Sequence, residues 1–295
     1  MTARPARIVD AHVHLWDPAR TDWYPYLAHS ASLGMGDVTS MARRFDVPAY
    51  RAEAAGWNVE KLINVAAATG RHSVDETLEL DRRAETDPTA DGHPDAIIGG
   101  LPPADSVAEA VALLDEQMAA ARFRGVRPMS PKAPPVPDDG VLRALAERDL
   151  IFELMAHPDQ LVDAAARFAA LGPLDGLTVV VEHAGWPRSA EADEFARWKV
   201  GMTALAAVGE HVACKLSGLA MPLGEIGGAA FRPWIEFAIE TFGVERCLFA
   251  SNFPVDGVHG SLDQLWSAYA EVTSGLEATD RDALFASNAE RLYRI

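Results

Sequence analysis

The chain has 295 residues, and its 43 acidic residues against 26 basic ones give a formal net charge of −17. With 49% hydrophobic and 23% charged residues, it has the composition of a packed globular protein and not of a disordered chain. The acidic surplus argues against nucleic acid or an anionic membrane as a partner, because both would be repelled. No apolar run reaches the roughly 18 residues of a membrane helix, and no apolar leader precedes the first histidines. We therefore expect a cytoplasmic protein, with Cys214 and Cys247 reduced in the core.

Short apolar runs recur along the whole chain and predict eight β-strands. Amphipathic stretches such as 106–122 and 158–172 lie between the runs and predict helices. Eight strands alternating with helices are typical of a single (β/α)8 TIM barrel, here one domain over 1–295. A doubly wound open sheet is the alternative, but no GxGxxG follows the first strand. The strands are expected within 7–15, 61–68, 96–101, 123–129, 150–158, 177–185, 211–219 and 246–254.

The longest gap between predicted strands follows the first one and is rich in aromatic residues. Residues 16–60 carry Trp16, Trp23, Tyr24 and Tyr26. In a barrel this segment would lie over the carboxyl ends of the strands, where loops carry the chemistry. It could form an aromatic lid, or its rings could simply pack the loop against the rim.

Two histidines end the first predicted strand. Side chains alternate along a strand, so Ile8, Asp10, His12 and His14 would share the face that points into the barrel. Two imidazoles at this end of a strand could chelate one metal ion or hold one anion. This pair is the sharpest functional signal in the sequence.

Two further histidines end later strands. His183 ends the sixth predicted strand, and alternation turns its neighbour Glu182 away from it, which makes Glu182 the poorer catalytic candidate. His157 ends the fifth strand just before a proline and could be only a rim residue. We expect His183 to act in catalysis and His157 to border the substrate.

Charged and polar residues on the fourth and seventh strands complete the candidate set. Arg124 and Arg127 lie on opposite faces of a regular strand, and Arg127 is nearer the carboxyl end. A guanidinium there could bind a substrate carboxylate or form a salt bridge with a barrel acid. Lys215 and Ser217 share one face of the seventh strand, where either could hydrogen-bond a substrate oxygen.

Five segments taken in order, VDAHVHLWDP, RGVR, EHAGWP, CKLSGL and FASNFPV, resemble the amidohydrolase superfamily, and more narrowly its amidohydrolase-2 branch. That branch includes lactonases acting on sugar lactones and on 2-pyrone-4,6-dicarboxylate. The resemblance implies that His12, His14 and His183 either bind one divalent metal ion, zinc or manganese, or polarise the substrate carbonyl without a metal. It also implies that a carboxylate after strand eight takes a proton from the attacking water.

The residue at that last position is Asn252, and an amide cannot act as a general base near neutral pH. The base could instead be His183, His157, Asp256 or the substrate's own carboxylate, or hydrolysis could have been lost. No lysine ends strand four to bridge two metals, so we expect no metal or one.

The leading hypothesis is a hydrolase that opens a lactone or related cyclic ester of a small substrate bearing a carboxylate or hydroxyl groups, and we expect an anionic one. The alternatives are a metal-dependent decarboxylase of an aromatic or unsaturated acid and a non-catalytic small-molecule binder. The sequence leaves the oligomeric state open, a homo-oligomer included. In the leading hypothesis Arg127 or Arg124 holds the anion, and the ring is walled by Trp16, Trp23, Tyr24 and Trp186.

Overall fold

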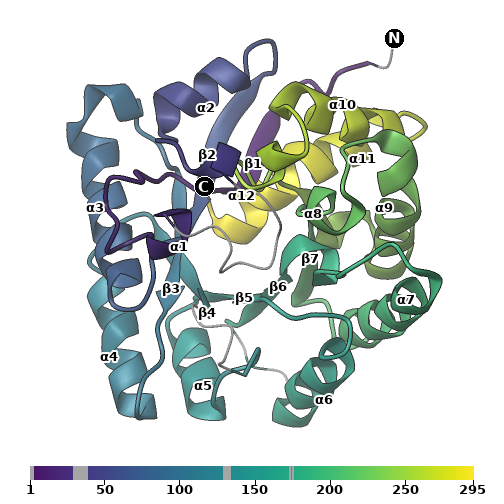
Figure 1. Ribbon diagram of the computed structural model, residues 1–295. Helices are drawn as coiled ribbons and strands as arrows, with labels where there is room; N and C mark the ends of the chain where they lie inside the picture. The colour runs from purple at the N-terminus through teal and green to yellow at the C-terminus, as the bar shows by residue number, and fades with distance from the viewer. Residues whose placement is uncertain (1–2, 29–38, 129–133, 173, 175) are drawn as a thin grey trace.

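A computed structural model describes residues 3–28, 39–128, 134–172, 174 and 176–295. It contains one sheet of eight parallel strands in the order β1 to β8, ringed by helices (Figure 1). An isolated parallel bridge between Val13 and Phe253 joins the first strand to the segment after the last. The predicted (β/α)8 barrel is confirmed. Its strands are β1 (Ile8–Val13), β2 (Val59–Val65), β3 (Ala96–Leu101), β4 (Phe123–Pro128), β5 (Ile151–Leu154), β6 (Thr178–Val181), β7 (Val212–Leu216) and β8 (Cys247–Phe249).

The helices pack their apolar faces on the outside of the sheet. Ser106 caps one of them, accepting a hydrogen bond from the Glu109 amide at 3.2 Å, and Gly172 ends another at a φ of 73°. Within the described part of the chain, no helix is both long and apolar enough to cross a bilayer. The α-helices are α1 (Pro25–Ala28), α2 (Val47–Glu53), α3 (His72–Thr86), α4 (Val107–Gln117), α5 (Asp139–Glu147), α6 (Leu161–Leu171), α7 (Ala192–Ala206), α8 (Ala220–Leu223), α9 (Gly228–Phe242), α10 (Leu262–Val272), α11 (Ala278–Asp282) and α12 (Asn288–Tyr293).

The barrel interior is filled by small and β-branched side chains that alternate with outward-facing ones. Val9, Ile98 and Val180 belong to this inner cluster. Ala289 and Tyr293 of α12 pack into the same cluster, and Tyr293 is fully buried. Helix α12 therefore closes one end of the barrel and forms its floor. The other end, where the strands have their carboxyl ends, remains open for a binding site.

The first strand does not keep one alternation along its whole length. Val9 and Ala11 pack in the inner cluster, whereas Asp10 turns outward and accepts a hydrogen bond from the Tyr50 hydroxyl of α2 at 2.7 Å. The pairing with β2 slips by one residue between Asp10 and Val13. This bulge re-aims the end of the strand, so His12 faces inward although Asp10 does not. The prediction that Ile8 and Asp10 share the inner face with the histidines is wrong for that reason.

Candidate active site

A pocket of about 180 Å³ opens at the carboxyl ends of the strands. Ligand sites of barrel enzymes lie at this end, because the strand-to-helix loops converge there. Part of the predicted aromatic loop, 29–38, lies outside the described residues. The described lining residues are His14, Trp16, Tyr26, Met41, Ala67, Arg127, Met155, His183, Trp186, Gly218, Met221, Asn252 and Val255.

Six residues predicted from the sequence line this pocket. Two are histidines, two are tryptophans, and the other two bring a guanidinium and an amide. The indole of Trp16 stacks on His14 at 5.5 Å between ring centres, and that of Trp186 meets His183 edge-on at 5.8 Å. The pocket thus combines apolar walls with a few polar groups, as small-molecule sites do. The six are His14, Trp16, Arg127, His183, Trp186 and Asn252.

Six predicted substrate-binding residues are not among the described lining residues: Trp23, Tyr24, Arg124, His157, Lys215 and Ser217. Trp23 and Tyr24 line a smaller cavity of about 40 Å³ that shares Trp16 with the main pocket. The Tyr24 hydroxyl donates to the buried Glu76 carboxylate at 2.8 Å, which fixes the loop to α3. Arg124 lies near the start of β4 and donates from Nε to the Tyr293 carbonyl at 2.9 Å, so it contacts the end of α12 and not the pocket.

His157 lies behind the pocket wall. Its ring stacks on Trp186 at 4.6 Å, and its Nδ1 lies 2.9 Å from the Trp186 carbonyl oxygen. A carbonyl can only accept, so Nδ1 carries the proton. This histidine supports an indole that lines the pocket and is not itself among the described lining residues.

Below the pocket lies a buried ion pair. The ammonium of Lys215 contacts both carboxylate oxygens of Glu153 at 2.6 and 2.7 Å, and both side chains are fully buried. The Tyr293 hydroxyl donates to the same carboxylate at 2.5 Å. Lys215 is therefore occupied, whereas its strand neighbour Ser217 lies 3.0 Å from Nδ1 of His183. Of the two polar residues predicted on strand seven, only Ser217 touches the pocket histidine.

Glu182 points into the barrel, contrary to the prediction. Val180 packs in the inner cluster, so alternation carries Glu182 to the same face. His183 then enters the left-handed region at a φ of 51°, which returns its ring to the pocket as well. The carboxylate of Glu182 lies 3.3 Å from Arg127 and 3.8 Å from His183. Glu182 therefore contacts two pocket residues, although strand alternation predicts that it points away from them.

The three barrel histidines are held in their neutral form. Burial, together with the nearby Arg127 charge, lowers the pKa of His14 to about 3. Burial also lowers the pKa of His183 to about 4, although the Glu182 carboxylate opposes this shift. The pKa of His12 is well below its usual value, first through burial and then through Lys215. Neutral imidazoles can accept protons or bind metal, so all three are chemically competent at neutral pH.

The position of the proton on the His14 ring follows from its hydrogen-bond partners. Nδ1 of His14 lies 2.8 Å from the Val65 carbonyl oxygen and must donate to it. Its Nε2 is then a bare acceptor, 3.2 Å from Nε2 of His12. His14 is therefore not a hydrogen-bond donor to a substrate carbonyl in this arrangement.

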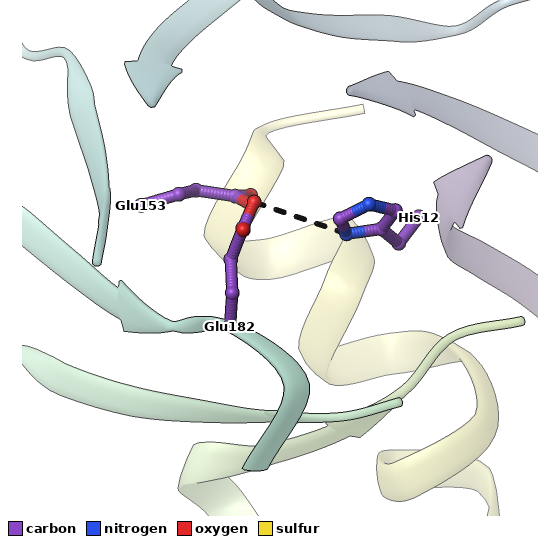
Figure 2. Close-up of side chains that lie close together, drawn as sticks. All are labelled: His12, Glu153 and Glu182. Carbon is purple, nitrogen blue, oxygen red and sulfur yellow. Dashed lines mark ion pairs between the residues drawn. The ribbon is translucent and has the colours of Figure 1, made fainter. Parts of the chain in front are cut away.

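Among the residues that the structure describes, one group of side chains could hold a metal ion. One nitrogen of His12 and carboxylate oxygens of Glu153 and Glu182 all lie within 4.8 Å of one another (Figure 2). The set predicted from the resemblance was His12, His14 and His183, and only His12 belongs to the group found. Nδ1 of His12 and Oε1 of Glu182 are both buried without a hydrogen-bond partner, which fits ligands of a cation. Lys215 and Arg127 already neutralise the two carboxylates, however.

Asn252 is tied to a buried carboxylate behind it. Its Nδ2 donates to Oδ1 of Asp256 at 2.9 Å, and its backbone adopts a φ of 55°, which asparagine tolerates. Burial raises the pKa of Asp256 to about 7, and the backbone amides of Gly218 and Ala220 oppose the shift. Asp256 is not among the described residues that line the pocket.

A family model described as amidohydrolase matches residues 9–295. The chain belongs to the amidohydrolase family. An uncharacterized protein of Sinorhizobium fredii is 31% identical to this amidohydrolase, with 98% of each chain covered. An L-fucono-1,5-lactonase of Burkholderia ambifaria is 28% identical, covering 97% of this chain and 95% of its own. The crystal structure of an amidohydrolase from Burkholderia multivorans with bound zinc is 26% identical, with a TM-score of 0.79 over 98% of this chain and 100% of its own. Family and relatives together support a hydrolase of small molecules for this amidohydrolase.

Proposed function

We propose that the protein hydrolyses a lactone or related cyclic ester that bears a carboxylate or hydroxyl groups. The observation that carries this proposal is a neutral His183 in a pocket that also presents the guanidinium of Arg127 and the amide of Asn252. The similarity to an L-fucono-1,5-lactonase supports a lactone as the ester.

His183 is the general base in this proposal. In the tautomer that this role requires, Nδ1–H donates to the Ser217 hydroxyl oxygen 3.0 Å away, and the lone pair on Nε2 is left to accept a proton from water. The water oxygen then bonds to the ester carbonyl carbon, and the ring C–O bond breaks. The imidazolium returns its proton to the leaving alkoxide, so the product is an open-chain hydroxy acid. Glu182, 3.8 Å from Nε2, stabilises the imidazolium while it exists.

Arg127 binds the anion and stabilises developing negative charge. Its Nε and Nη2 donate to the Ala66 carbonyl, which fixes the guanidinium plane at the pocket edge. Such a preorganised cation stabilises the charge that forms on the carbonyl oxygen during attack. The indoles of Trp16 and Trp186 provide apolar surface for the ring.

A metal ion held by His12, Glu153 and Glu182 would supply Lewis acidity near the carbonyl. The steps above use only the protein's own groups. Metal content is thus a separate variable that the experiment measures directly.

The test is a panel of lactones followed by acid release in a pH-stat, with carbon dioxide measured in parallel. The panel contains L-fucono-1,5-lactone, dihydrocoumarin and 2-pyrone-4,6-dicarboxylate, before and after chelation, with metal determined by elemental analysis. We expect acid without carbon dioxide. Carbon dioxide would replace the proposal by a decarboxylase, and neither product over a broad panel would leave only a binder.

The matched variants are His183→Ala and His211→Ala. His211 is a half-buried histidine outside the described lining of the pocket. Loss of activity in the first and retention in the second would support His183 as the base. Equal retention in both would remove His183 from the reaction.

A further inference from the structure

We propose that Asp256 is a positioning residue that fixes the Asn252 amide, so that the amide oxygen can orient the attacking water. This inference rests on the proposed hydrolysis. It assigns a function to a buried carboxylate that the reaction steps above do not use.

The hydrogen bond between the two side chains is buried and has an ordinary length. Nδ2 of Asn252 lies 2.9 Å from Oδ1 of Asp256, and the side chains are 3% and 0% exposed. The local backbone supports the contact, because the Asp256 amide donates to the Asn252 carbonyl at 3.1 Å. The backbone N–H of Asn252 in turn donates to the backbone carbonyl of His12 at 2.9 Å, which connects this turn to strand β1.

A carboxylate determines which way an amide faces. Above the raised pKa of Asp256, about 7, its carboxyl group is ionised and can only accept hydrogen bonds, so the nitrogen of the Asn252 side chain must face it. The oxygen Oδ1 is then the acceptor left for the pocket, which Asn252 lines together with His183. An amide without such a partner could rotate and present either group.

Two acceptors on one water give that water a direction. His183 takes one proton, and Oδ1 of Asn252 accepts the other O–H, so the water oxygen is aimed at the carbonyl carbon. An amide cannot take up the proton itself, so Asn252 contributes orientation only. Asp256 acts through Asn252 and touches neither substrate nor water.

The experiment exchanges the polarity of the pair. Three variants are compared: Asp256→Asn, Asn252→Asp and the double exchange Asn252→Asp/Asp256→Asn. Asp256→Asn leaves the Asn252 amide without a fixed acceptor. Asn252→Asp buries two carboxyl groups about 3 Å apart, where both cannot ionise together. In the double exchange, the amide at position 256 can donate to the carboxylate at position 252. The pair again has one donor and one acceptor, and the carboxylate is on the pocket side.

We expect kcat to fall at least tenfold in each single variant, with KM changed less than about threefold. The double exchange should regain at least tenfold over Asn252→Asp and unfold at a higher temperature than that variant. Asp81→Asn is the matched control, because the Asp81 carboxylate also accepts backbone amides, those of Ala121 and Arg122, away from the pocket. It should lower the unfolding temperature and leave kcat unchanged.

Two results would overturn the inference. One is Asp256→Asn with kcat within threefold of the wild type, whatever its stability. The other is additivity of the two single changes in the unfolding free energy, because paired side chains must couple. A wild type that hydrolyses no lactone refutes the proposed function. In that case the double-mutant cycle of unfolding free energies still tests whether the Asn252 and Asp256 side chains interact.

Discussion

Replacing Lys215 by methionine tests the ion pair beneath the pocket. Its ammonium contacts both oxygens of Glu153, at 2.6 and 2.7 Å, in a place where neither side chain is exposed. Removing one partner of such a pair leaves the other as an uncompensated buried charge, which destabilises proteins by about 3–5 kcal/mol. Burial already raises the pKa of Glu153, and Lys215 opposes this. Without Lys215 the carboxyl takes up a proton, which limits the loss to that range.

The assay is urea unfolding at pH 7, followed by tryptophan fluorescence and analysed for the midpoint and the slope. Lys215→Met should lower the free energy of unfolding by about 3–5 kcal/mol at an unchanged slope. The double variant Lys215→Met/Glu153→Leu should recover most of that loss, because apolar replacement of a buried pair is often neutral or stabilising. Arg232→Met serves as the control, since its pair with Glu236 is exposed and should contribute less than about 1 kcal/mol.

A loss of less than about 1 kcal/mol in Lys215→Met, the range of an exposed pair, would show that the buried ion pair does not stabilise the fold in this way. A double variant no more stable than Lys215→Met would contradict the expected recovery, because the apolar pair would then not replace the charged one.

Three further predictions concern catalysis and pH. His183→Ala should lower kcat by about 10²-fold or more in steady-state kinetics, and a loss under threefold in a folded variant would contradict its role. Arg127→Lys keeps the charge but loses the planar fork, so KM should rise about tenfold for carboxylated lactones and little for neutral ones; equal changes for both would refute anion binding. Stability should fall as pH rises from about 5 to 8, because burial raises the pKa of Glu76 and Asp256 to about 7. In that window the folded protein keeps protons that the unfolded chain has released, and Glu76→Gln should flatten the urea-midpoint profile; an unchanged slope would remove Glu76 from the effect.

The barrel could be predicted because its strands are buried on both faces. Continuous apolar runs mark such strands, and the amphipathic stretches between them mark the covering helices. Strand β3 at Ala96–Leu101 has the predicted bounds, and β5 at Ile151–Leu154 lies inside its predicted run. The hydrophobic pattern does not define the exact ends of the strands, because the chain remains apolar where it leaves the sheet.

The site was predicted less completely, and the errors arise from backbone geometry. Alternation places Asp10 and His12 on one face, but a bulge between them separates the two. Alternation also places Glu182 and His183 on opposite faces, but the left-handed backbone at His183 turns both inward. The sequence has no glycine in the bulge of β1 or at His183 that would indicate either feature.

The links to residues far along the chain could not be predicted either. Asp256 was a candidate for the base, and the structure places it one residue layer behind Asn252. Nothing in the local sequence shows that Tyr293 reaches Glu153, because 140 residues separate them. Contacts of this kind depend on how the barrel closes and not on local periodicity.

The position of Tyr293 has a consequence for the order in which the protein is made. Helix α12 follows all eight strands along the chain, yet its tyrosine completes the hydrogen bonding of a carboxyl group on β5. During synthesis, Glu153 and Lys215 leave the ribosome well before the residue that covers them from below. A nascent barrel therefore carries an incompletely satisfied charge pair at its open floor until residue 293 has been added. Proteins that fold while being synthesised are exposed to misassembly in such intervals, so this floor is where a chaperone would have most to protect.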